Sequence, residues 1–159
     1  MYKTGHWGSA LLVYAPVGGV LLAGGWRGAA LVGGAVVLAL ARVPDYDQRI
    51  PFVSHRGPTH TLGFAVLVAL ATGAAGLALA GTLAPGRRLV VGAFCALAGL
   101  LSILSHLLAD ALTPAGIRPF WPVSSRSYSL DLVRADSALG NYMVLSLGVF
   151  VTAALVAAL

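Results

Sequence analysis

Five long apolar runs, separated by short polar or Gly/Pro-rich joints, limit what this chain of 159 residues can fold into. A membrane-spanning helix needs about 20 mostly apolar residues. Hydrophobic residues make up 58% of the chain and charged residues only 9%, whereas soluble domains carry about a quarter charged residues. The runs cover about residues 8–26, 29–43, 61–83, 89–112 and 138–159. The sequence therefore predicts an all-α, integral membrane helical bundle of about five transmembrane helices, forming a single transmembrane domain over residues 1–159.

Composition argues against several other classes. The single cysteine, Cys95, lies inside an apolar run, so it has no partner for an internal disulfide and cannot build a thiolate metal site. The net charge of +5 does not come from a basic patch with interleaved aromatic residues, so no nucleic-acid partner is expected. The first run contains Pro16 and lacks a clear cleavage site, which argues against a cleaved signal peptide.

All the histidines and three of the five acidic residues lie in four clusters at the ends of the apolar runs. The clusters are Gly5-His6, Asp45-Tyr46-Asp47, His55-Arg56-Gly57-Pro58-Thr59-His60 and His106-Leu107-Leu108-Ala109-Asp110. With five spans, all four clusters reach the same membrane face. Ionisable groups at such positions are costly and are functional candidates by default.

The distribution of basic residues predicts which face this is. Seven basic residues lie on the clustered face and three on the other. The seven are Lys3, Arg42, Arg49, Arg56, Arg118, Arg126 and Arg134, and the three are Arg27, Arg87 and Arg88. The positive-inside rule therefore places the clusters at the cytoplasmic side of the cell membrane.

The pair His106 and Asp110 gives the strongest signal for chemistry. A spacing of four residues puts both side chains on one side of a helix, where imidazole and carboxylate can bind Zn²⁺, Mn²⁺ or Fe²⁺. The alternative is a hydrogen-bonded pair buried for structural reasons. His55 and His60 lie on either side of a predicted helix start, where Pro58 suits the first turn and Gly57 or Thr59 could cap the helix. The alternative for the two histidines is that they are interfacial residues.

Asp45, Asp47 and His6 are weaker candidates on their own. In an extended segment alternate residues point the same way, so both carboxylates could face one ion. The alternative for them is a turn that ends a helix. His6 would be read as an interfacial residue if the other clusters did not share its face.

The clusters, taken in order, resemble a known family. The motifs are Gly5-His6, Pro44-Asp45-Tyr46-Asp47, His55 to Thr61, and Ser105 to Gly116 followed by Trp121-Pro122. Over about residues 1–142 the chain resembles the YdjM-like family of membrane-bound, metal-dependent hydrolases, whose hydrolase label rests on the same His/Asp pattern. Members usually carry Pro-Asp-x-Asp-His at the second motif, and Gln48 stands here in place of that histidine. The resemblance implies a metal site more strongly than it implies a substrate.

Residues and resemblance together predict a metal site that holds one or two divalent ions, with zinc the first expectation and manganese or iron next. The expected ligands are His6, Asp45, Asp47, His55, His60, His106 and Asp110. Asp47 could instead act as general base. Arg56 has a fork that suits a phosphate, and the other residues expected to bind substrate are Arg118, Arg126, Arg134 and Asn141. Asn141 could orient a ligand or simply cap the backbone.

The function that we expect is a membrane-embedded, metal-dependent hydrolase with membrane lipid as its partner, acting on a phosphoester such as a lipid head group. The alternative is a non-enzymatic divalent-metal binder or transporter. A transporter usually places ionisable groups near the bilayer midplane, whereas the clusters here lie near helix ends. A third alternative is a stability or assembly factor, in which the metal only holds the helices together.

Overall fold

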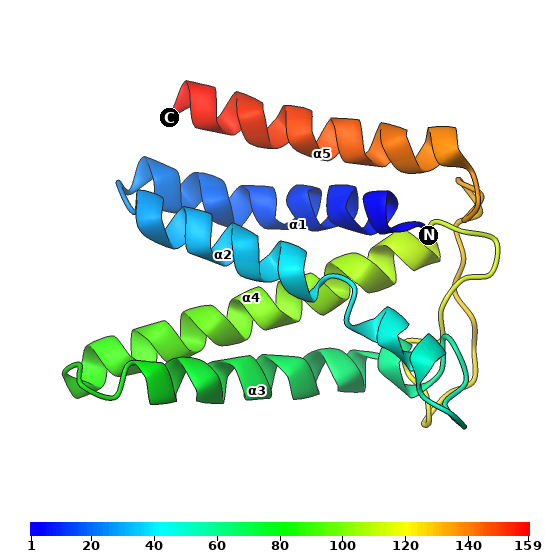
Figure 1. Cartoon of the computed structure of the whole chain (residues 1–159), viewed down its shortest axis with the longest axis horizontal. Helices are drawn as coiled ribbons and strands as arrows, with labels where there is room; N and C mark the ends of the chain where they lie inside the picture. The colour runs from blue at the N-terminus through cyan, green and yellow to red at the C-terminus, as the bar shows by residue number, and fades with distance from the viewer.

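The structure, a computed structural model, describes all 159 residues and is all-helical (Figure 1). Its long helices are α1 (Lys3–Ala23), α2 (Arg27–Leu40), α3 (Leu62–Leu79), α4 (Pro85–Ala111) and α5 (Ala138–Ala158). Two short 3₁₀ helices, η1 (Pro44–Arg49) and η2 (Pro58–His60), lie between α2 and α3. Five segments are long and apolar enough to cross a membrane, with α2 and η1 counted together as Arg27–Arg49. The predicted all-α membrane bundle is confirmed.

Helices α1 and α4 form the centre of the bundle (Figure 1). Helix α1 packs against α2, α4 and α5, whereas α3 packs against α4. In α1 and α4, 39% of the most apolar stretch is buried inside the protein, against 11% in α3 and α5. The two most enclosed helices are therefore the ones that carry His6 and the His106–Asp110 pair.

Glycines let α1 and α5 approach closely. A side chain at Gly8 would collide with the backbone of Val144 and Leu145, and one at Gly148 would collide with the backbone of Gly8. In lipid the hydrophobic effect does not push helices together, so membrane helices associate through close packing. Small residues at a helix crossing allow that close packing.

Buried serines hold α4 against its neighbours near the polar end. Ser9 donates from Oγ to the carbonyl of Ser105 at 2.8 Å, and Ser102 donates to the carbonyl of Val37 at 2.8 Å. Each hydroxyl thereby satisfies its hydrogen-bonding potential where no water is present. These contacts fix the depth at which α4 sits beside α1 and α2.

Several helix boundaries differ from the sequence prediction. The fourth helix was expected from residue 89, but α4 begins at Pro85, because proline is well tolerated in the first turn, where its missing N–H has no helical partner. The third helix was expected to reach residue 83, but α3 ends at Leu79. The first helix was expected from residue 8, which would place His6 before it, but α1 begins at Lys3 and His6 lies within its opening turns.

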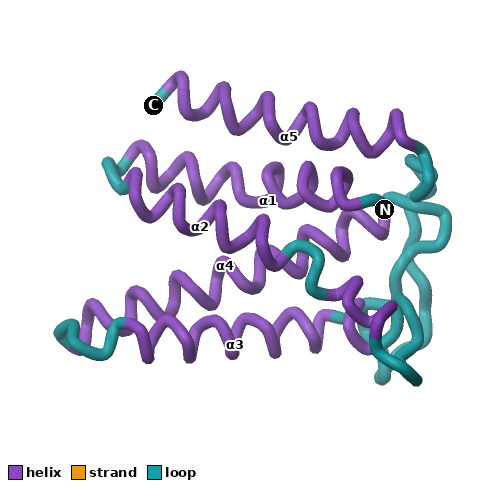
Figure 2. Tube along the Cα trace, in the orientation of Figure 1, coloured by secondary structure: helices purple, strands orange, loops and turns teal.

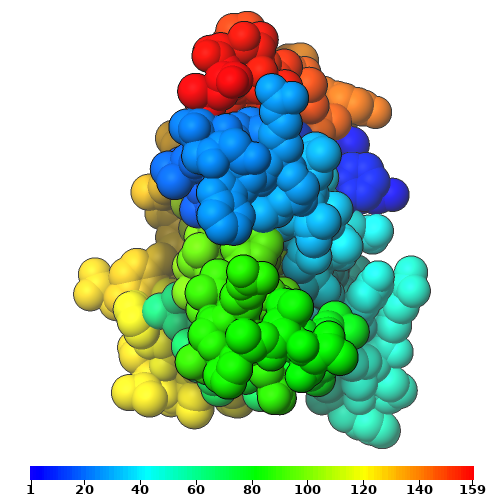
Figure 3. Space-filling view, turned by 90° about the vertical axis from the view of Figure 1, so that its left-hand side faces the viewer, coloured from blue at the N-terminus to red at the C-terminus, as the bar shows by residue number.

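The two longest loop segments gather at one end of the bundle, together with the N-terminus (Figure 2). The segments 41–61 and 112–137 meet there, where Leu62 donates its backbone N–H to the carbonyl of Pro119 at 2.9 Å. Ile117 and Tyr128 form an isolated antiparallel bridge within the second segment. Seen along the helices, these loops reach past the outline of α3 and α4 (Figure 3).

Candidate metal centre

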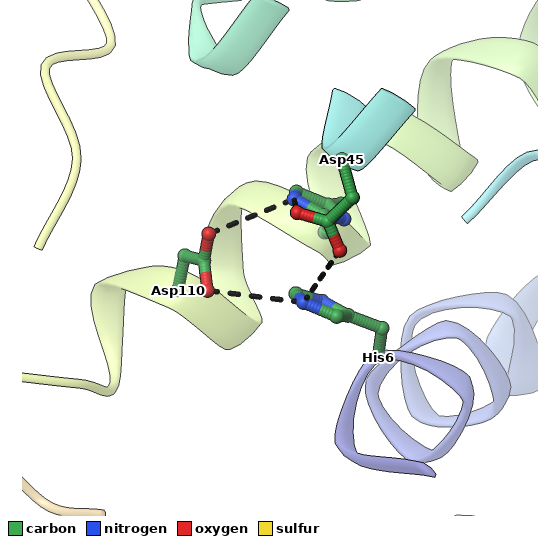
Figure 4. Close-up of side chains that lie close together, drawn as sticks. His6, Asp45 and Asp110 are labelled. Atoms are coloured by element: carbon green, nitrogen blue, oxygen red, sulfur yellow. Dashed lines mark ion pairs between the residues drawn. The ribbon is translucent and has the colours of Figure 1, made fainter. Parts of the chain in front are cut away.

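Side chains from four elements converge at the loop end of the bundle. His6 comes from α1, Asp45 from η1, His60 from η2, and His106 with Asp110 from α4. Figure 4 shows His6, Asp45 and Asp110 pointing toward one another. The rings of His6 and His106 stack with centroids 3.9 Å apart. All of these side chains are buried except Asp45, which is 18% exposed.

The ligand-type atoms form two groups that share Asp45. The inner group consists of His6, Asp45, His106 and Asp110, and the outer group of Asp45, His55 and His60. Within each group the ligand atoms all lie within 4.8 Å of one another. The structure thus brings six of the seven predicted ligands into two adjoining groups that could each hold a metal ion.

His60 also approaches the inner group closely. Its Nε2 lies 3.1 Å from Nε2 of His106 and 3.4 Å from Oδ2 of Asp110. Oδ1 of Asp45 lies 3.7 Å from the same atom of His60 and 3.6 Å from that of His106. Ligands at ordinary bonding distance from a tetrahedral zinc ion are about 3.4 Å apart. These four distances, 3.1–3.7 Å, are therefore close to those between ligands of a single ion.

Hydrogen bonds on the far side of each ring fix the tautomers of His106 and His60. His106 donates from Nδ1 to the carbonyl of Ala41 at 2.7 Å, since a carbonyl can only accept. Thr59 gives its hydroxyl proton to Asp47, so its oxygen accepts from Nδ1 of His60 at 3.0 Å. In the neutral rings both Nε2 lone pairs then face each other, an arrangement that needs a cation between them.

His6 supplies a second sign that the centre is built for a metal. Its side chain is completely buried, and neither ring nitrogen has a hydrogen-bond partner. Buried polar atoms without partners are rare and call for an explanation such as an ion. A proton shared by His60 and His106 would leave both nitrogens of His6 without a partner, whereas a metal ion bound by the inner group would give Nε2 of His6 a partner. The residues present therefore fit a divalent metal.

Asp110 divides its two oxygens between cations and ligands. Oδ1 accepts from the amino group of Met1 at 2.7 Å and from Nη2 of Arg56 at 3.1 Å. Oδ2 faces His60 and His106. The two donors hold the carboxylate in place and leave one oxygen directed at the centre, which is how outer partners orient a metal ligand.

The electrostatic field of the centre favours positive charge. Burial lowers the pKa of His60, but its contacts with Asp110 and Asp45 raise that pKa more, so the net shift is upward. The same carboxylates that stabilise a proton on this imidazole also stabilise a metal cation.

Asp47 lies outside both groups, unlike the sequence expectation. Asp45 and Asp47 were expected in an extended segment, but they lie in the 3₁₀ helix η1, where residues two apart point about 120° away from each other. Asp47 instead hydrogen-bonds Nδ1 of His55 through Oδ1 at 2.9 Å and accepts from Thr59 through Oδ2 at 2.8 Å. Its buried carboxylate orients both histidines of the outer group.

A cavity of about 370 Å³ opens beside the outer group. His55, Arg56, Arg118, Trp121 and Ser127 are among its lining residues. Cationic, aromatic and hydroxyl side chains together suit an anionic ligand with an apolar part.

Arg56 connects the cavity with the metal centre. Besides its contact with Asp110, it donates from Nη1 to Oγ1 of Thr113 at 3.3 Å and to the carbonyl of Gly116 at 3.0 Å. Gly116 has φ +61°, a conformation in which a larger side chain would be strained. A guanidinium has five N–H donors, so the three contacts leave two for a ligand.

The remaining residues expected to bind substrate do not line this cavity. Arg126 lies over the ring of Tyr128 at 5.3 Å. Arg134 is exposed and pairs with Asp136 at 3.1 Å, which lowers the pKa of that carboxyl. Asn141 is buried and hydrogen-bonds to the backbone. Its side chain accepts from the N–H of Tyr2 at 2.8 Å and donates to the carbonyl of Ser137 at 2.8 Å.

Several residues that support the centre were not predicted from the sequence. Thr59 and Thr113 lie inside the third and fourth motifs, where a hydroxyl beside a predicted ligand was a usable signal. The carbonyl of Ala41, which fixes the tautomer of His106, has no side-chain signal at all. Only the packing of α2 against α4 reveals it.

Comparison with known proteins agrees with the assignment of this chain to a membrane. Searches of curated proteins and of solved structures returned no match. The sequence does match, over residues 1–159, the family described as YdjM inner membrane protein. The match confirms the resemblance seen in the motifs and extends it to the whole chain. The chain belongs to the YdjM inner membrane protein family.

Proposed function

We propose that this protein is a membrane-embedded, metal-dependent hydrolase that cleaves a phosphoester, such as one on a lipid head group. The observation that carries the proposal is the direct contact between the two halves of the site. Arg56 lines the cavity and also donates to Asp110, a member of the inner group. A bound anion would therefore lie next to the metal ligands.

The metal content that we propose follows from the two groups. The inner group, joined by Nε2 of His60, holds one ion tightly. His55 and Asp45 hold a second and more exchangeable ion, and the carboxylate of Asp45 is shared between the two ions, because the one free nitrogen of His60 faces the inner group. Imidazole and carboxylate ligands favour zinc, and manganese or iron(II) are the next candidates.

Each part of the site has a chemical role in this proposal. A divalent ion supplies Lewis acidity and makes water a nucleophile near neutral pH. The free N–H donors of Arg56 bind an anionic oxygen pair and stabilise the charge that develops during hydrolysis. Arg118 adds a second cation to the cavity wall. Asp47 acts through His55 and His60, which it orients, rather than as the base.

A direct test uses the purified protein in vesicles of phosphatidylethanolamine and phosphatidylglycerol. The protein is depleted of metal, reloaded with Zn²⁺, Mn²⁺ or Fe²⁺, and assayed for phosphate release from a panel of lipid and small phosphoesters. We expect metal-dependent cleavage that His106→Ala abolishes. If the reloaded protein cleaves no phosphoester or amide but moves the metal across the vesicle membrane, the transporter takes the place of the hydrolase.

We also propose that the centre faces the cytoplasm. The support is the excess of basic residues, seven against three, at the loop end of the bundle. Ser54→Cys in a Cys95→Ala background offers a single exposed thiol beside the cavity. Labelling of intact cells by a membrane-impermeant reagent should fail, and labelling of inverted vesicles should succeed. The opposite pattern would reverse the orientation.

A further inference from the structure

Two loop segments next to the cavity carry large apolar side chains that no other part of the protein covers. In the first segment, residues 50–53, the side chain of Phe52 is fully exposed and Ile50 is 52% exposed. In the second, residues 120–123, Val123 is 95% exposed, and Phe120 and Trp121 remain nearly half exposed. Neither segment belongs to a membrane-spanning helix. Such contiguous apolar surface outside the spans indicates a binding partner.

The position of these segments limits what that partner can be. Figure 3, which looks along the helices, shows the chain around residue 50 and the chain around residue 120 reaching past α3 and α4 on opposite sides. The spans Leu62–Leu79 and Pro85–Ala111 fix where the bilayer lies. Loops that extend sideways at the end of these helices lie over the lipid molecules that surround them.

The chemistry of the segments fits a lipid head-group layer. Arg49 directly precedes the first segment, and Arg118 and Arg126 flank the second; all three are exposed. Aromatic and apolar side chains interleaved with arginine are typical of the boundary between acyl chains and anionic head groups. Exposure of the apolar side chains to water is unfavourable, whereas this boundary accommodates both the apolar side chains and the arginines.

The backbone adds an independent observation. Phe52 has φ 69° and Arg56 has φ 60°, a left-handed conformation that is rare for bulky residues. Strained residues persist where their surroundings require that geometry and often mark contact sites. At Phe52 no protein neighbour covers the side chain, so the side chain is free to make an external contact.

We propose that residues 50–53 and 120–123 form two interfacial arms, which insert their apolar side chains into the head-group layer on either side of the cavity. Ser54 and Arg118, next to the two arms, both line the cavity. The arms therefore place its mouth at the lipid surface. This role concerns contact with the membrane and does not depend on hydrolysis.

Nitroxide labels in a Cys95→Ala background test the arms in vesicles of phosphatidylethanolamine and phosphatidylglycerol at about 3:1. Labels at Phe52→Cys and Val123→Cys are compared with two controls: Asp136→Cys, an exposed site in the same loop region, and Leu147→Cys, an exposed site on α5. Accessibility to oxygen and to a water-soluble nickel chelate is measured by electron paramagnetic resonance.

We expect label 136 to be open to nickel, and labels 52 and 123 to be less accessible to nickel than label 136, with an oxygen accessibility between those of labels 136 and 147, as a position in the head-group layer requires. Nickel accessibility at 52 and 123 equal to that at 136 would overturn the arms. Exclusion of both reagents would mean that a protein surface covers the segments, and would overturn the proposal as well. A negative hydrolysis assay would leave the label result unchanged, so the two proposals fail separately.

Discussion

The inner and outer groups are built from the same residue types but sit in different surroundings. His6, His106 and Asp110 come from the two most enclosed helices and are at most 1% exposed. His55 comes from a loop, and 42% of its side chain is exposed at the cavity. Rigid, buried ligands lose little freedom on binding and exclude water, whereas an exposed loop ligand exchanges easily. We therefore expect the inner group to set metal affinity and the outer group to meet the substrate.

The largest effect should come from breaking the inner group. His106→Ala removes the imidazole that faces both His60 and Asp110. Loss of a residue that only orients a metal ligand already costs about 10–100-fold in metal affinity, so we expect loss of the ligand itself to cost more than about 100-fold. Competition with a fluorescent chelator measures the affinity. Unchanged helical circular dichroism serves as the folding control, and a folded variant that keeps its metal would remove His106 from the centre.

Breaking the outer group should have a smaller and separable effect. In His55→Ala we expect the tightly held ion to remain and the second, exchangeable ion to be lost, because the inner group does not use His55. Titration with Zn²⁺ or Mn²⁺ counts the sites. Ser54→Ala, a change at the neighbouring cavity residue, is the matched control. If His55→Ala released both ions together, the two groups would act as one site.

Asp47→Asn tests whether the buried carboxylate orients ligands or binds metal itself. Asparagine keeps the shape but removes the charge that pairs with His55 and His60. We expect metal affinity to fall by roughly 10–100-fold with the number of sites unchanged. Gln48→Ala, at the exposed neighbour, should have no effect. A lost site in Asp47→Asn would show that this carboxylate is a ligand after all.

Arg56→Lys should leave metal binding least affected while lowering activity. Lysine keeps the positive charge near Asp110 but loses the fork that reaches Thr113 and Gly116. We expect a roughly 100-fold drop in kcat, the usual cost of removing one donor to a developing oxyanion. Arg126→Lys, away from the cavity, is the control. Equal activity of both variants would exclude Arg56 from catalysis.

The sequence predicted the helices and the convergence of the polar clusters well, because both follow from local patterns. Apolar length fixes a span, and the spacing of His106 and Asp110 fixes a shared helix face. The divergence of Asp45 and Asp47 depended on whether the chain after α2 was extended or a 3₁₀ helix, and local pattern did not decide that. The placement of Arg126, Arg134 and Asn141 away from the cavity depends on the path of a long loop, which tertiary contacts determine.

The central claim is that the buried His/Asp centre binds a divalent metal, and elemental analysis of the protein tests it most directly. The protein is purified in detergent without chelator, and its metal content is measured before and after addition of Zn²⁺ or Mn²⁺. The two groups predict one retained ion per chain and a second after addition. Protein that retains no transition metal and takes up neither added ion would contradict the account, because the buried Nε2 of His6 would then have no partner.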